Sequence, residues 1–370
     1  MLEIVSPNLK RLEDYAFEIG PIRPPSEGGS SSLLIRATRN CPWSRCTFCY
    51  ALPYNRETFE LRPLQDIKKD IEAVRAICEV VGGVSWKLGL AGRVDGLVGA
   101  AILRANPRLQ SQPSFVTVFN WLASGARTVF LQDANTLVMR SRDLVEVVRH
   151  LKQTFPSVER VTSYARSHTA SRKSPEELRA LREAGLTRLH IGLESGDGEV
   201  LKAVDKGVTA AGHILAGRKV KEAGIELSQY VMPGLAGRAR WEEHARGTAL
   251  VLNEIDPDYV RLRPFVPRPH TPLFDAYARG EMELTSPHHR LREIKLMVGL
   301  LEFTGRLCFD HLTNSLYRED GHFRPLFDQD YEGYKFPEHK SEVLALVEKG
   351  LAVDESRFLS AEDMARMPNL

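Results

Sequence analysis

Three cysteines fall within nine residues in the segment RNCPWSRCTFCY (39–50), at the spacing Cx4Cx2C. Cys41, Cys46 and Cys49 thus offer three thiolates on one loop, and thiolates are ligands of zinc and of iron–sulfur clusters. A structural zinc usually has four protein ligands, but no further cysteine or histidine lies nearby. Three thiolates suit a 4Fe–4S cluster whose fourth iron binds a non-protein ligand. A zinc site and unligated core thiols are the alternatives.

Composition excludes several classes of protein. The 50 basic and 48 acidic side chains leave a net charge of +2, so no polybasic arm or acidic tail dominates the 370 residues. Five cysteines, three of them clustered, do not form a secreted disulfide framework. We find no apolar run long enough to span a membrane and no signal-peptide segment. The sequence therefore predicts a cytoplasmic protein with no membrane span, for which a nucleic-acid partner is unlikely.

Short apolar runs alternate with amphipathic helical segments along most of the chain. The predicted strands are SLLIRAT (32–38), ARTVFLQ (126–132), ERVTSYA (159–165), TRLHIGL (187–193), IELSQYV (225–231) and DYVRLRP (258–264). Helices are predicted between them, over residues 64–81, 142–153, 210–223 and 241–254 among others. Such alternation is typical of a parallel sheet whose functional residues follow the strands.

The predicted fold is therefore α/β: a partial parallel (β/α)6 TIM-type barrel with a mostly helical C-terminal extension. We expect a lead-in over residues 1–31, the barrel over residues 32–280 and the extension over residues 281–370.

The chain resembles the radical S-adenosylmethionine (SAM) superfamily, in particular the branch of Elp3 and oxygen-independent coproporphyrinogen oxidase. That family usually has CxxxCxxC after its first barrel strand, so the present loop is one residue longer. The other matching segments, in strand order, are LQDANTL (131–137), HIGLESG (190–196) with EVLKAVDKG (199–207), YVMPGLAG (230–237) and DYVRLRPFVP (258–267).

The resemblance implies two cofactors, a 4Fe–4S cluster and SAM. Cys41, Cys46 and Cys49 would ligate the cluster, and SAM would chelate its open iron. One electron, from a donor such as flavodoxin or ferredoxin, would then cleave SAM to a 5′-deoxyadenosyl radical that abstracts hydrogen from the substrate. The cofactors carry this chemistry, while the protein orients them and excludes water.

Residues in the matching segments are predicted to contact SAM. Asp133 and Asn135 could accept from its ammonium, Arg166 could bind its carboxylate as a fork, and Glu194 could accept from its ribose. The full predicted set is Phe48, Asp133, Asn135, Ser163, Arg166, Glu194, Gln229 and Gly234. Each of these residues also has an alternative role. Asp133 and Asn135 could be turn residues, Arg166 could lie at the surface, and Glu194 could cap a helix.

The substrate site is predicted around the sixth strand. Arg261, Arg263, Arg268 and His270 lie on and just after it, and such arginines suit a carboxylate or phosphate; arginines facing the outer helices are the alternative. Candidate catalytic residues are Arg263, His270, His168 and Tyr230. We expect a small organic substrate. Modification of a tRNA or protein, or a haem or cluster carrier on the same fold, are the alternative functions.

Overall fold

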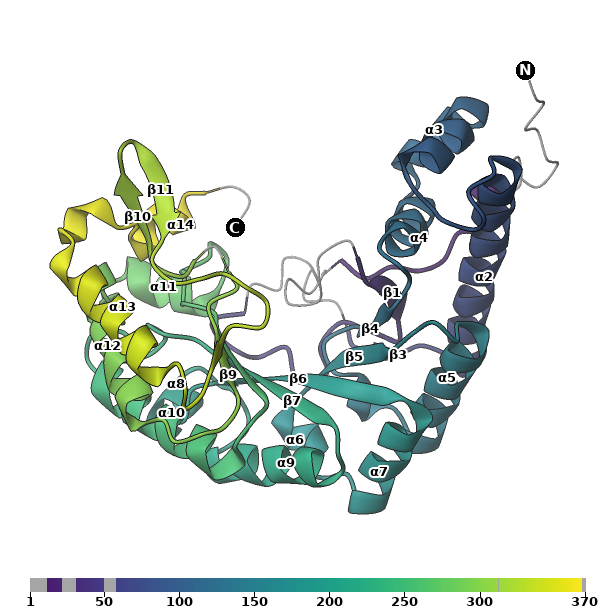
Figure 1. Cartoon of the computed structure of the whole chain (residues 1–370). Helices are drawn as coiled ribbons and strands as arrows, with labels where there is room; N and C mark the ends of the chain where they lie inside the picture. The colour runs from purple at the N-terminus through teal and green to yellow at the C-terminus, as the bar shows by residue number, and fades with distance from the viewer. Residues whose placement is uncertain (1–11, 22–30, 50–57, 312, 368–370) are drawn as a thin grey trace. The chain divides into compact units, whose positions relative to one another are not determined.

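The computed structural model describes residues 12–21, 31–49, 58–311 and 313–367 (Figure 1). Its main sheet has eight strands in the order β1-β4-β5-β6-β7-β8-β9-β12. The six predicted strands are all present: β1 (Leu33–Arg36), β4 (Thr128–Gln132), β5 (Arg160–Ala165), β6 (Leu186–Glu194), β7 (Glu226–Val231) and β8 (Tyr259–Leu262). The parallel pairs β1–β4, β4–β5 and β7–β8 confirm the predicted α/β partial barrel.

Helices separate the parallel strands, as the apolar periodicity predicted. The described helices are α2 (Leu64–Lys87), α3 (Gly96–Ala105), α4 (Pro113–Ala123), α5 (Ser141–Thr154), α6 (Ser167–Ala170), α7 (Pro175–Ala184), α8 (Gly198–Ala203), α9 (Ala210–Glu222), α10 (Trp241–Ile255), α11 (Pro272–Ala278), α12 (Pro287–Leu300), α13 (Lys340–Ala352) and α14 (Ala361–Ala365). None of the helices in the described part of the chain is long and apolar enough to cross a membrane.

The C-terminal extension adds strands as well as helices. After α12, β9 (Arg306–Cys308) pairs in parallel with β8, so the strand–helix alternation continues for one more unit than predicted. β12 (Tyr334–Lys335) then pairs antiparallel with β9. A hairpin of β10 (Leu316–Glu319) and β11 (His322–Pro325) stands apart from this sheet (Figure 1). These strands are too short to show an apolar alternation in the sequence.

The chain divides into two compact units. Unit 1 comprises residues 1–42, 57–164 and 179–188, and unit 2 comprises residues 43–56, 165–178 and 189–370. Each unit has a core of buried aliphatic and aromatic side chains. The predicted domain limits at residues 31 and 280 stay predictions, and most of the lead-in lies outside the described residues.

Candidate functional site

Hydrogen bonds and an ion pair join the cysteine segment to the residues that follow α8. The Thr47 amide donates to the Val204 carbonyl at 3.0 Å, and the Trp43 indole N–H donates to the Asp205 carbonyl at 2.6 Å. The Arg45 guanidinium adds an ion pair to the Asp205 carboxylate at 2.9 Å. Three contacts within five residues hold the segment against residues 204–205.

The absence of a side chain at Gly207 leaves room for the Trp43 indole. The φ of Gly207 is +69°, and a Cβ added there would lie 2.4 Å from the Trp43 ring. The Arg45 and Arg166 guanidinium carbons each lie 4.8 Å from the ring centroid, a cation–π geometry. The Trp43 side chain therefore lies against a backbone position that only glycine can leave open.

Lys206 places a buried positive charge beside this segment. Its ammonium donates to the Glu194 carboxylate at 2.8 Å and lies 5.7 Å from the Phe48 ring centroid. Burial alone would lower the pKa of Lys206, but attraction to Glu194 and to the Cys46 thiolate outweighs it and raises the pKa. Lys206 is therefore protonated at neutral pH and stabilises negative charge at Cys46.

The structure places the three predicted ligands on one half-buried segment. Cys41 belongs to unit 1, while Cys46 and Cys49 belong to unit 2, where the Cys49 amide donates to the Cys46 carbonyl at 3.1 Å. Among the described residues no three His, Cys, Asp or Glu side chains are grouped to hold a metal ion. Ligation by these thiols therefore stays a prediction from their spacing. Soft thiolate donors beside a buried cation do fit an iron–sulfur cluster.

The predicted SAM residues of unit 1 are buried. Asp133, 2% exposed, accepts on one oxygen from the Arg36 guanidinium at 2.8 and 3.2 Å and from the Asn40 amide at 3.1 Å. That oxygen is therefore occupied by the protein itself. Asn135 and Ser163 are fully buried.

The Ser163 hydroxyl is also engaged within unit 1. It donates to the Leu131 carbonyl at 2.8 Å and shares a short hydrogen bond with the Thr136 hydroxyl. The first contact joins β5 to β4, and the second joins β5 to the residues that follow β4.

In unit 2, Arg166 and Gly234 are held by contacts that the sequence did not indicate. The Arg166 guanidinium donates to the Lys206 carbonyl at 2.6 Å. Gly234, at φ +84°, donates its amide to both Glu293 carboxylate oxygens at 3.0 Å. Glu293 lies on α12 and also meets the His244 ring at 3.2 Å. The glycine turn after β7 is thus fixed by the C-terminal extension.

Successive residues of β7 point to opposite faces of the sheet. Tyr230 stacks on His190 of β6, with ring centroids 5.4 Å apart, and the Arg263 guanidinium lies 5.1 Å from its ring. Gln229 therefore faces the other side. It is fully buried, and neither polar atom of its amide has a hydrogen-bond partner among the described residues.

The two candidate histidines differ in their surroundings. His168, on α6, is half-buried, and burial together with the charges of Arg172 and Arg166 lowers its pKa. His270 is exposed before α11, at φ +69°. The structure thus gathers Arg263 and Tyr230 with His190, while His270 stays at the surface.

Arg261 of β8 and Arg263, directly after it, share one carboxylate. Asp310 accepts from Arg261 at 2.6 Å and from Arg263 at 2.9 Å, one on each oxygen. Asp310 follows β9 in the C-terminal extension and belongs to no motif, so the sequence did not indicate it.

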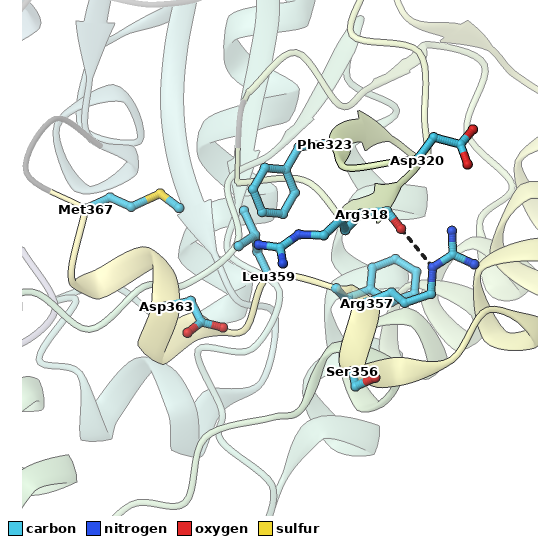
Figure 2. Close-up of a pocket in the computed structure, with 9 residues that line it drawn as sticks. Arg318, Asp320, Phe323, Ser356, Arg357, Leu359, Asp363 and Met367 are labelled. Atoms are coloured by element: carbon cyan, nitrogen blue, oxygen red, sulfur yellow. Dashed lines mark hydrogen bonds between the residues drawn. The ribbon is translucent and has the colours of Figure 1, made fainter.

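A separate pocket of about 750 Å³ lies between the β10–β11 hairpin and the last described residues (Figure 2). The Arg318 guanidinium lies 5.1 Å from the ring centroid of Phe323, and both line this pocket. None of the predicted site residues lines it.

Comparison with known proteins matches part of the chain to a family model. The Radical SAM superfamily model matches residues 106–246. The match begins after the cysteine segment, so it does not test the Cx4Cx2C motif.

Three similar proteins illustrate the range of the family. The tRNA uridine(34) acetyltransferase of Methanocaldococcus infernus is 27% identical over 111 residues, which cover 30% of this chain and 21% of the relative. The haem chaperone HemW of Bacillus subtilis is 20% identical over 48% of this chain and 47% of its own length. The structure of coproporphyrinogen III oxidase from Escherichia coli is 16% identical, covers 78% of this chain and 54% of that chain, and has a TM-score of 0.44.

The chain thus spans about a fifth of the acetyltransferase and about half of the haem chaperone. Residues 106–246 thus match the radical SAM superfamily, as the ordered motifs predicted, and a domain of this superfamily uses a 4Fe–4S cluster and SAM.

Proposed function

We propose that Cys41, Cys46 and Cys49 hold a 4Fe–4S cluster and that the enzyme acts on a small organic substrate. When bound, the cluster and SAM supply a 5′-deoxyadenosyl radical that abstracts hydrogen from the substrate. The observation that carries this proposal is the cysteine segment itself. It is fastened to residues 204–205, with the Lys206 ammonium placed to balance thiolate charge.

This chain's own residues would bind and orient SAM. The proposed contacts are Phe48, Asp133, Asn135, Ser163, Arg166, Glu194, Gln229 and Gly234. Gln229 stays among the proposed contacts, but its buried, unpartnered amide lies on the face of β7 opposite Tyr230, so its position adds no support. Glu194 and Arg166 support it because both lie next to Lys206, beside the cysteine segment.

Substrate would lie against the face of β7 and β8 that carries Tyr230 and Arg263. His168 and His270 stay candidate catalytic residues with them. We propose an electron donor such as flavodoxin or ferredoxin as the partner. We also propose a cytoplasmic location, because free thiols and reduced clusters suit a reducing compartment.

Anaerobic reconstitution tests the proposal. With iron, sulfide, dithionite and SAM, the wild type should bind about four irons per chain and release 5′-deoxyadenosine. C46A should lose both signals, whereas C78A should keep them, because Cys78 lies on α2 outside the segment. Zinc without iron in anaerobically purified protein, or full iron in C46A, would contradict the proposal.

Modification of an RNA is the second candidate function. Similarity to a tRNA uridine(34) acetyltransferase favours it. Nucleic acid that co-purifies with the protein and stimulates release of 5′-deoxyadenosine would support it. A haem carrier is the third candidate, favoured by similarity to the haem chaperone HemW. A Soret band after haem addition, without SAM cleavage, would support that reading.

A further inference from the structure

Arg261 lies on β8, and Arg263 directly follows the strand, where its amide still donates to the Val231 carbonyl of β7 at 2.8 Å. The two residues are two positions apart in extended chain, so both side chains project to the same side. Arg261 Nε donates to the Ser228 hydroxyl at 3.3 Å, and Arg263 lies over Tyr230. Ser228 and Tyr230 are likewise two residues apart, on β7. Two neighbouring strands thus present two guanidinium groups on the face where substrate would lie.

Among the ion pairs of the described residues, this cluster has two guanidinium groups and one carboxylate. Asp310 is shared between the two guanidinium groups, so one carboxylate opposes two cations. Burial alone would raise the pKa of Asp310, but attraction to Arg263 and Arg261 lowers it, and the carboxylate stays ionised.

The titratable neighbours do not remove the excess. Burial raises the pKa of the Cys308 thiol to about 12 and lowers the pKa of His311 to about 4, so both are neutral at pH 7. The charge of Arg268 also acts on His311 and adds to the positive side. Glu332, the further carboxylate in reach, accepts from the Tyr259 hydroxyl and pairs with Arg306.

One donor in the cluster is unsatisfied. Arg261 is fully buried between Tyr259 and Tyr331, whose ring centroids lie 4.8 and 4.3 Å from its guanidinium carbon. Its Nη2 has no hydrogen-bond partner among the described residues. A buried charged donor without an acceptor costs free energy, so it marks a place for an anionic oxygen.

Arg263 makes the cluster accessible. Its side chain is 15% exposed, whereas that of Arg261 is 0% exposed. A ligand can therefore reach Arg263 first, and Arg261 stands behind it. The planar guanidinium offers two parallel N–H groups that match a carboxylate or a phosphate.

We propose that the Arg261–Arg263 cluster binds an anionic oxygen group of the substrate, a carboxylate or phosphate. Arg263 makes the contact, Arg261 is a positioning residue, and the Asp310 carboxylate, which bridges both guanidinium groups, competes with the anion for them. The aromatic pair His190–Tyr230 lines the adjoining surface, so an aromatic or planar body next to the anion suits it. This inference rests on the proposed function, because only that proposal makes the bound anion a part of the substrate.

Binding of simple anions tests the cluster without knowledge of the substrate. The full-length, anaerobically reconstituted protein is titrated with benzoate, phenyl phosphate or neutral benzamide at constant ionic strength, and Tm and calorimetric Kd are measured. We expect saturable binding of one anion and none of benzamide. The stronger of benzoate and phenyl phosphate identifies carboxylate or phosphate as the group recognised.

Single substitutions test whether the anion binds at the Arg261–Arg263 cluster. R263Q should weaken the anion Kd at least tenfold, which corresponds to about 1.4 kcal/mol. R263K, which keeps the charge but loses the fork, should fall between R263Q and the wild type. D310N should tighten the Kd several-fold, because a competing carboxylate is removed. R292Q, an exposed arginine of α12, is the matched control and should bind like the wild type.

Binding that is equal in R263Q and the wild type, or no anion binding in the wild type, overturns the inference. Iron content and 5′-deoxyadenosine release are measured on the same samples. Anion binding without a cluster would reject the proposed function alone, and a working cluster without anion binding would reject this inference alone.

Discussion

Each unit holds a cluster of arginines around carboxylates, but the charge balance of the two clusters differs. In unit 1 three arginines meet four carboxylates, and the set is Glu18, Arg36, Arg39, Glu60, Arg62, Asp70 and Asp133. In unit 2, Arg261 and Arg263 share the carboxylate of Asp310 among the ion pairs of the described residues. Carboxylates thus outnumber guanidinium groups in the first network, whereas guanidinium groups outnumber carboxylates in the second.

The difference separates structural from ligand-binding arginines. Glu18 accepts from Arg36 and Arg39 and pairs with Arg62, so one carboxylate joins the chain before β1 to β1 and to the residues before α2. Such a network fixes segments that are far apart in the sequence. An excess of guanidinium groups, with one donor unsatisfied, instead leaves capacity for an external anion.

The largest expected effect is on the unit 1 network. Arg62 donates to Asp70 at 2.6 Å, and its side chain is only 4% exposed. R62M should lower the free energy of unfolding by about 3–5 kcal/mol, because it leaves a buried carboxylate without its partner. R263M should lose less, about 1–3 kcal/mol, since Asp310 keeps Arg261. Urea denaturation measures the free energy of unfolding of both variants. Equal losses would contradict the expected difference between the two arginine clusters.

Removal of the carboxylate that Arg261 and Arg263 share should lower stability, and an added anion should restore part of the loss. D310N should destabilise the protein by about 1–3 kcal/mol, because two buried guanidinium groups lose their acceptor. Benzoate should restore part of the Tm in D310N. It should not do so in D133N, where Arg36 still has Glu18. Thermal unfolding with and without benzoate decides this, and rescue of both variants alike would contradict it.

Acid should weaken both clusters. The pKa of Glu18 is lowered, chiefly by its hydrogen bond from Arg39, and that of Asp310 is lowered by its two arginines despite burial. A carboxylate with a lowered pKa contributes its stability above the ordinary value of about 4, and this stability is lost as the pH falls through the folded-state pKa. Tm should therefore fall between pH 5 and pH 3. D310N should show a shallower fall, and an unchanged slope would exclude a contribution from Asp310.

The smallest effect is expected at the edge of the unit 1 network. Glu60 accepts from Arg39 at 2.6 Å, but its side chain is 58% exposed. E60Q should change the free energy of unfolding by less than about 1 kcal/mol, because solvent screens the pair. Urea denaturation in low and high salt measures this change. A loss as large as that of R62M would contradict the expectation that buried ion pairs of the network contribute more stability than exposed ones.

The parts of the fold with strong periodicity were predictable. All six strand–helix units through β8 follow from apolar runs and helical spacing. Ser174 and Glu177, which have the S-x-x-E spacing of a capping box, form its two hydrogen bonds before α7, at 2.8 and 3.2 Å. β9 escaped prediction because three residues, RLC, carry no readable period and pairing with β8 decides their conformation.

The site was predictable where residues lie in motifs, but their partners were not. Arg263 and Tyr230 were singled out, but Asp310 lies 47 residues beyond Arg263 in an unmarked segment. Gly234 was singled out, but Glu293, 59 residues away, holds its amide. Such pairs depend on tertiary packing, which no local pattern encodes. Alternation alone could have separated Gln229 from Tyr230, but without a known face it did not say which of the two meets substrate.

The attachment of the cysteine segment sets the length of its loop. Trp43 and Thr47 are the two attachment points, and they meet consecutive residues, Asp205 and Val204. Ser44, between them, has a φ of +47°, so the chain turns sharply there. Deleting Ser44 to reach the usual CxxxC spacing would therefore pull either the indole from Gly207 or the Thr47 amide from Val204. The longer spacing in this protein and the bare backbone at Gly207 are therefore parts of one arrangement, and a change in either one disturbs the other.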